Sequence, residues 1–128
     1  MGELYDTTVF IDYWRGDQGA RALVERARLS PKSATYSPLS AMELWQYPRL
    51  TRKEEIEYVA LTLFLREAPV TTSIGRQAGQ WLRGGRRRDR MRLAADALVA
   101  ATAQETGDTV RTRNVADISK FYSRVQPY

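Results

Sequence analysis

The chain has 128 residues, 43% hydrophobic and 27% charged, with a net charge of +5 and a pI near 9.8. It contains no histidine and no cysteine, which excludes thiolate nucleophiles, histidine bases, disulfides and zinc sites built on those ligands. An enzyme made from this inventory must work with carboxylates, hydroxyls, arginine and a bound ion. A hard cation such as Mg²⁺, for which Mn²⁺ can substitute, suits that chemistry.

The length predicts one domain over residues 1–128. No apolar run approaches the roughly 20 residues of a membrane span, and the start of the chain lacks a signal-peptide pattern. Together with the absence of cysteine, these features lead us to expect a cytoplasmic protein without a membrane partner.

The positive charge comes almost wholly from arginine, because Lys32, Lys53 and Lys120 are the only lysines. Arginine is the preferred side chain for bidentate contact with phosphate. A nucleic acid is therefore the first partner to consider.

The first half of the chain alternates strand and helix patterns. A buried strand is expected at 3–5, followed by a helical pattern over 9–14. Asp17 is a candidate N-cap of a second helix, a second strand is expected at 33–37, and Ser40 is expected to cap a third helix. Thr51 begins an amphipathic helix, and its expected apolar face consists of Ile56, Val59, Ala60, Leu63 and Phe64.

In the second half, residues 68–70 form a link or a strand, and a helix runs from Thr72 or Ser73 to Leu82. An alanine-rich helix is expected at 93–106, closed by Gly107. A strand at 109–112, a short helix at 115–121 and a last strand at 124–126 complete the pattern. Alternating strands and helices predict an α/β domain with a short, mainly parallel sheet flanked by helices.

Four carboxylates lie where an apolar stretch meets a helix: Asp6, Glu43, Asp96 and Asp117. An ionised carboxylate beside buried apolar side chains is costly unless something pairs with it. Ligands of parallel sheets bind at the carboxyl ends of the strands. The topology therefore predicts that the four acids converge there on one divalent cation, and all four are candidate catalytic residues.

Asp6 and Asp96 are the first candidate metal ligands, and Glu43 is expected to complete the site directly or through water. Asp117 is expected to close the site, with Asn114 one helical turn before it, and the Thr7 and Thr8 hydroxyls to orient Asp6. Such a cluster can activate water against a phosphodiester without histidine or cysteine.

Each acid alone has simpler interpretations, namely a helix cap or a salt bridge to an arginine. Glu43 follows Ser40 by three residues, which is the spacing of a capping box. Asp12 and Asp17 are most simply a helix-surface acid and a capping acid.

The densest charge run is residues 83–92, which contains Arg86, Arg87 and Arg88. It is a candidate contact for a phosphate backbone, and a solvated surface is an equal alternative. Among the aromatic residues that invite base stacking, Trp81 has the spacing of a core residue. Trp45 and Tyr47 fit a dimer contact equally well.

Four segments together resemble the PIN-domain ribonucleases, specifically the VapC type of bacterial and archaeal toxin–antitoxin modules. They are residues 5–11 (YDTTVFI), 40–44 (SAMEL), 95–103 (ADALVAATA) and 110–117 (VRTRNVAD). The resemblance covers essentially the whole chain. It implies a PIN-like three-layer fold and a Mg²⁺-dependent endoribonuclease that forms homodimers and is inhibited by a cognate VapB-type antitoxin.

The chain departs from that family at Thr8, where Asn or Ser is frequent, and at Asn114, where a fourth Asp is frequent. Asn114 and Asp117 are therefore alternatives for the fourth member of the site. A catalytically silent PIN-like domain that binds RNA or protein is the main rival hypothesis. A phosphatase of the haloacid-dehalogenase type is disfavoured because Thr8 stands where its second aspartate is required.

Overall fold

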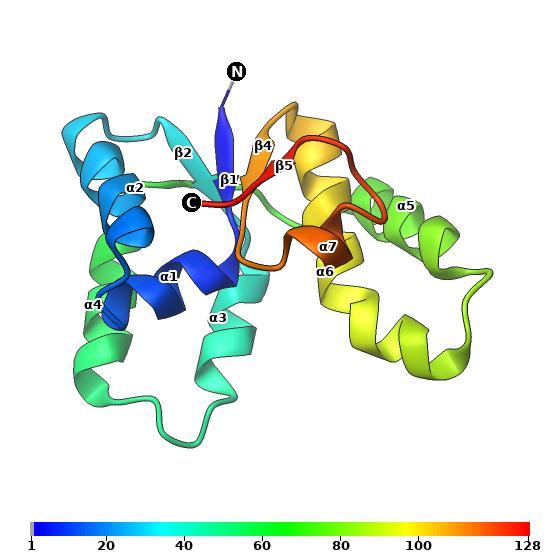
Figure 1. Cartoon of the computed structure of the whole chain (residues 1–128), viewed down its shortest axis with the longest axis horizontal. Coiled ribbons are helices and arrows are strands. Elements are labelled where there is room, and N and C mark those ends of the chain that lie inside the picture. The colour runs from blue at the N-terminus through cyan, green and yellow to red at the C-terminus, as the bar shows by residue number, and fades with distance from the viewer. Residues whose placement is uncertain (1) are drawn as a thin grey trace.

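A five-stranded sheet runs through the centre of the molecule (Figure 1). The computed structural model describes residues 2–128. The strand order is β3-β2-β1-β4-β5, and every neighbouring pair is parallel. The strands are β1 (Glu3–Tyr5), β2 (Ala34–Tyr36), β3 (Arg66–Glu67), β4 (Thr109–Arg111) and β5 (Val125–Gln126).

Helices cover both faces of this sheet (Figure 1). One layer contains α1 (Thr7–Trp14), α2 (Gln18–Leu29), α3 (Leu39–Trp45) and α4 (Arg52–Thr62). The other contains α5 (Thr72–Leu82), α6 (Arg87–Thr106) and α7 (Val115–Ile118). The predicted three-layer α/β fold with a parallel sheet is confirmed.

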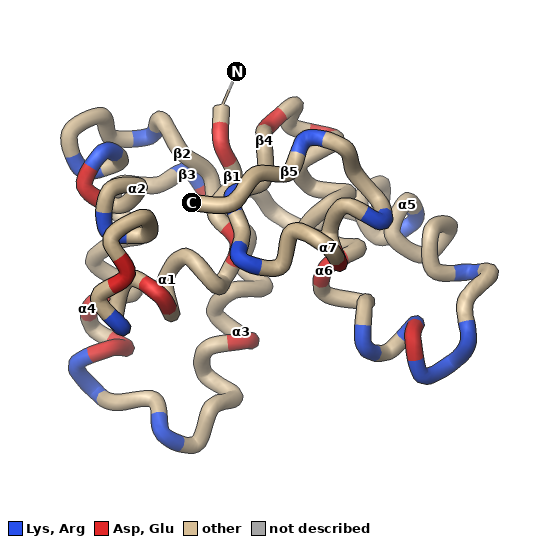
Figure 2. Tube along the Cα trace, in the orientation of Figure 1, with Lys and Arg blue, Asp and Glu red and all other residues tan. Residues whose placement is uncertain are grey.

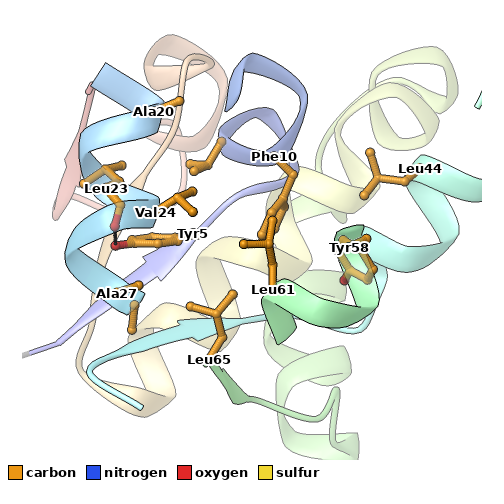
Figure 3. Close-up of a cluster of buried hydrophobic side chains, with 12 residues drawn as sticks. Tyr5, Phe10, Ala20, Leu23, Val24, Ala27, Leu44, Tyr58, Leu61 and Leu65 are labelled. Carbon is orange, nitrogen blue, oxygen red and sulfur yellow. Dashed lines mark hydrogen bonds between the residues drawn. The ribbon is translucent and has the colours of Figure 1, made fainter. Parts of the chain in front are cut away.

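Alternation along β1 assigns its neighbouring side chains to the two layers. Leu4 packs with Val110 and with α6, whereas Tyr5 packs into the larger cluster formed by α1 to α4. Figure 3 shows Tyr5 beside α2, where its hydroxyl donates a hydrogen bond to the Leu23 carbonyl oxygen over 2.9 Å. Because both faces of β1 are buried, the residue that follows it is held in a fixed position.

Two local signals in the sequence are confirmed. The Asp17 side chain accepts a hydrogen bond from the Ala20 amide over 2.9 Å and caps α2. Gly107 ends α6 with φ +80°, a left-handed conformation that glycine adopts without a Cβ clash.

Several predicted boundaries are wrong. Residues 87–92 of the arginine segment belong to α6, which begins at Arg87 and not at 93, because arginine favours helix and nothing after Arg86 interrupts it. The short helix α7 ends at Ile118 and not at 121. Residues 68–70 form a link, one of the two alternatives predicted for them, and the strand β3 comes just before it at 66–67. Ser40 lies inside α3 and does not cap it.

The predicted apolar face of α4 is also wrong. The helix buries Tyr58 and Leu61, while Ile56, Val59 and Leu63 are 56%, 57% and 71% exposed. The buried residues and the exposed ones form two rows along the helix, each with helical spacing, so periodicity cannot show which row is buried. Tyr58 is on the buried side because its ring makes an edge contact with Phe10, with the centroids 5.2 Å apart.

Trp81 has the core position expected for it, with its ring stacked on Phe121 at 5.8 Å between centroids. None of the helices formed by residues 2–128 combines the length and apolarity needed to cross a membrane. The assignment of residues 1–128 to one domain stays a prediction.

Candidate functional site

The four predicted acids come from elements that meet at the carboxyl ends of the strands. Asp6 directly follows β1, and Glu43 lies on α3, the helix after β2. Asp96 lies on α6, and Asp117 lies on α7, just beyond β4. Figure 2 shows acidic segments of α3 and α6 near the centre of the view. The charges of Asp6, Asp117 and Glu43 each raise the pKa of Asp96, so all three lie within electrostatic range of it.

Asp6 is the most buried of the acids, with 5% of its surface exposed. Its Oδ2 accepts hydrogen bonds from the hydroxyls of Thr112, over 2.8 Å, and Thr8, over 3.2 Å. Burial raises the pKa of Asp6, although the Thr112 hydroxyl opposes this effect. It is the N-cap residue of α1, but its side chain makes no capping hydrogen bond. The backbone amides of Thr7 and Thr8 at the start of α1 also lower its pKa.

Glu43 is held by Thr7, whose hydroxyl lies 2.7 Å from Glu43 Oε1 and 2.8 Å from the Ser40 hydroxyl. The capping-box interpretation of Ser40 and Glu43 is wrong, because Pro38 is the N-cap of α3. Burial and the charge of Asp6 raise the pKa of Glu43. The expectation that both threonines orient Asp6 holds only for the Thr8 hydroxyl, since the Thr7 hydroxyl contacts Glu43.

Asp96 has no hydrogen-bond or ion-pair partner within residues 2–128. Burial and then the charges of Asp6, Asp117 and Glu43 raise its pKa to about 7, while Arg92 has a smaller opposite effect. A half-buried carboxylate without a partner beside three other acids is unfavourable in isolation. This arrangement is typical of a site that binds a positively charged group.

Asp117 has a different environment. It forms ion pairs with Lys120 over 3.2 Å and Arg92 over 3.4 Å, and the Lys120 contact is the main reason that its pKa is lowered. Asn114 is exposed, and its side chain makes no capping hydrogen bond to α7. Its backbone amide instead donates to the Thr112 hydroxyl over 2.9 Å. Neither residue is thereby established as the fourth member of the site.

The donor chemistry of this cluster fits a hard divalent cation, since every candidate ligand is a carboxylate oxygen. Across residues 2–128, however, no three acidic side chains converge closely enough to make a ready cation site. Asp6, Asp96 and Glu43 remain the predicted ligands.

Comparison with known families identifies the fold. The PIN domain model matches residues 4–120. The chain belongs to the PIN-domain family. A comparison with curated protein sequences gives no match.

Solved structures share this PIN fold over nearly their whole length. A toxin–antitoxin complex from Klebsiella pneumoniae has a chain 22% identical, with TM-score 0.70 over 98% of this chain and 96% of that one. A chain of DNA-bound VapBC from Salmonella typhimurium is 18% identical, with TM-score 0.71 over 99% and 98%. A chain of FitAB bound to a DNA fragment is 19% identical, with TM-score 0.67 over 98% and 94%.

Three residues that support the acids of this PIN domain were not predicted as site residues. Thr112 forms a hydrogen bond with Asp6, and Ser40 forms one with Thr7. Arg92 forms an ion pair with Asp117. Arg92 precedes Asp96 by one helical turn, a spacing visible in the sequence. Nothing in the sequence indicates that Thr112 contacts a residue 106 positions earlier.

The predicted RNA contacts, Arg86, Arg87 and Arg88, are exposed and form no ion pair among the residues described. They lie where α5 connects to α6, at the lower right of Figure 2. Arg88 precedes Asp96 by two helical turns, or about 12 Å along α6. These arginines are therefore separate from the acids.

The raised pKa of Asp96 gives a prediction for stability. A carboxyl with a folded pKa of about 7 and an unfolded pKa near 3.9 contributes stability below about pH 4, and this contribution is lost as the pH rises through 7. With chelator present, Asp96→Asn should therefore have a higher Tm than the parent at about pH 8, and the difference should vanish towards about pH 4.

Thermal unfolding across this pH range measures the effect. Glu25→Gln is the control, because Glu25 forms only an exposed ion pair with Arg28. A parent that is at least as stable as Asp96→Asn at the alkaline end would contradict the prediction.

Proposed function

We propose that this PIN domain is a Mg²⁺-dependent endoribonuclease, the toxin component of a type II toxin–antitoxin system acting in the cytoplasm. The observation that carries the proposal is Asp96, a half-buried carboxylate without a partner whose pKa is raised to about 7 by burial and by three neighbouring acids. A catalytically silent PIN-like domain would have no need to retain this unfavourable arrangement.

Asp6, Asp96 and Glu43 would hold the cation. A divalent cation bound there would activate water and offset the negative charge that develops on the scissile phosphate. Thr8 and Thr112 fix the Asp6 carboxylate, and Thr7 fixes Glu43. These hydroxyls orient two of the three ligands before substrate arrives.

Asp117 and the arginines have supporting roles in this proposal. The ion pairs with Arg92 and Lys120 hold Asp117 at the edge of the acidic cluster. Arg86, Arg87 and Arg88 are free to contact phosphates of the RNA chain, and such contacts supply affinity without reading sequence.

The test is incubation of the purified protein with single-stranded RNA in the presence of Mg²⁺. Internal cleavage at phosphodiester bonds is expected. RNA that stays intact while the protein is folded would favour the silent PIN-like domain.

We further propose that a cognate VapB-type antitoxin binds and inhibits the protein. Structures with the same fold are described as a toxin–antitoxin complex, as VapBC and as FitAB. These descriptions concern those proteins. The shared fold and the resemblance in sequence support the proposal that this chain also has an antitoxin partner.

A second copy of the chain is the partner proposed for the exposed face of α4. Ile56, Val59 and Leu63 follow one another at helical spacing, and Trp45 on α3 is 43% exposed beside this row. A contiguous exposed apolar surface favours a protein contact, and a two-fold axis would place this face against its own copy.

Replacing Val59 with arginine should therefore shift the protein from dimer to monomer, because it would put a charge into the apolar contact. Sedimentation or light scattering measures the mass. Leu29→Arg is the control, since Leu29 is 87% exposed on α2 and lies outside this face. A parent that is already monomeric, or a dimer that tolerates Val59→Arg, would contradict this surface.

A further inference from the structure

A cleft of about 400 Å³ is lined by side chains from α1, from α3 and from the residues that follow them. It lies between α1, α3 and the segment that leads from α3 into α4. Figure 1 shows that segment at the bottom of the view. Trp14, Leu44 and Tyr47 supply apolar and aromatic surface, and Arg15, Arg49 and Arg113 supply positive charge. This combination of an aromatic surface with several arginines is typical of sites for single-stranded nucleic acid.

None of the four acids lines the cleft, but three segments that line it also carry residues of the candidate site. Leu44 is next to Glu43 on α3, and Ile11 lies one helical turn after Thr7 and Thr8 on α1. Arg113 follows Thr112, and its backbone amide donates to the Thr8 hydroxyl over 3.0 Å. These shared segments place the cleft next to the residues that hold the acids.

A buried acid holds one of the arginines and lies near a second. Asp12, 8% exposed, accepts hydrogen bonds from Arg113 Nε over 3.0 Å and from the Tyr128 hydroxyl over 2.6 Å. Arg15 lies 4.0 Å from the same carboxylate. Asp12 is thus not merely a helix-surface acid: it holds Arg113 at the cleft.

The third arginine, Arg49, is available to bind a ligand. Arg49 is exposed and has no hydrogen bond or ion pair with any residue from 2 to 128. The only acid that lines the cleft, among the described residues, is Glu54, and its Oε1 accepts from the Thr51 amide and hydroxyl over 2.9 and 3.0 Å. The lining arginines outnumber the lining acids, so the cleft favours an anionic occupant.

We propose that this cleft binds an unpaired nucleotide of the RNA next to the scissile bond, with its base against Tyr47 and a phosphate on Arg49 and Arg113. The inference rests on the proposed ribonuclease function and adds where the substrate chain runs. The RNA would also contact Arg86, Arg87 and Arg88 on the other side of the acids, so the RNA chain would cross the acidic residues.

The test uses a short unstructured RNA and the full chain carrying Asp96→Asn, which prevents cleavage during binding. Affinity is measured at several salt concentrations, with and without Arg49→Ala or Tyr47→Ala. Arg76→Ala is the matched control, because Arg76 is also exposed and unpaired among the residues described, but lies on α5 in the other layer.

Arg49→Ala should lower the slope of log affinity against log salt by about 0.7, the value for one lost phosphate contact on single strands, and Arg49→Lys should restore it. Tyr47→Ala should weaken binding by about 10-fold without changing the slope, because stacking carries no charge. Arg76→Ala should change neither quantity.

A second outcome is that the parent cleaves RNA while Arg49→Ala and Tyr47→Ala leave both the affinity and the slope unchanged. That result would overturn RNA binding in the cleft but not the ribonuclease function, and the cleft would then be a surface for a protein segment. RNA that the parent neither cleaves nor binds would overturn the proposed function, and this inference with it.

Discussion

Replacing Asp6 or Asp96 with asparagine should abolish RNA cleavage while the protein stays folded. Both carboxylates are proposed ligands of the same cation. Groups that merely support a metal ligand typically contribute about 10- to 100-fold to activity, so loss of a direct ligand should cost at least about 100-fold. Asparagine retains the size of aspartate and an oxygen that can accept from Thr8 and Thr112 at position 6.

The measurement is the initial rate of cleavage of a labelled RNA at saturating Mg²⁺, with the Tm of each variant recorded beside it. RNA binding should persist, because arginines provide the phosphate contacts. Glu25→Gln again serves as the control, being a conservative change of an exposed acid. If both aspartate variants cut RNA at the parent's rate, the site is misplaced.

Chelation of divalent cations should stop cleavage by the parent to the same extent. The chain has no histidine or cysteine, so no thiolate or imidazole is present to activate water at neutral pH. Mg²⁺ added back in excess over EDTA should restore the rate, and Mn²⁺ should substitute because it prefers the same oxygen ligands.

The check is one reaction divided among EDTA alone, EDTA with excess Mg²⁺ and EDTA with excess Mn²⁺. The Asp96→Asn variant should stay inactive in all three. Cleavage that continues unchanged in chelator would refute a metal-dependent mechanism, whatever the effect of the aspartate substitutions.

Much of the fold was predictable because its signals are local. A buried strand running straight into Asp6 and an acid cap at Asp17 are each encoded in a few consecutive residues. Gly107 is a third example, since the left-handed residue that closes α6 needs glycine. The strand–helix alternation then fixes a parallel sheet, whose carboxyl ends bring Asp6 and Asp96 together.

The errors lie where tertiary contacts choose between equivalent local patterns. The two rows of α4 have the same helical spacing, and only the packing of Tyr58 against Phe10 decides which one is buried. Thr7 and Thr8 are adjacent hydroxyls, yet α1 directs the first to Glu43 and the second to Asp6. No property of the two side chains distinguishes them.

The contacts that support the site from distant parts of the chain could not be predicted from the sequence either, because they too depend on tertiary structure. Thr112 binds Asp6 because β1 and β4 are neighbours in the sheet, with Tyr5 in register with Arg111. The order of the strands brings the side chains of Thr112 and Asp6 together. That order depends on all the connections between strands and helices along the chain. The role of Asp12 as a partner of Arg113 also depends on that pairing.

The central claim is that Asp6, Asp96 and Glu43 bind a divalent cation, and thermal unfolding with increasing Mg²⁺ in the absence of RNA tests it most directly. A ligand that binds only the folded state raises Tm, by on the order of 5 °C for a domain of this size when its concentration far exceeds Kd. We predict such a rise for the parent and none for Asp6→Asn. Equal Tm shifts in the two proteins, or no shift in the parent at millimolar Mg²⁺, would contradict the account.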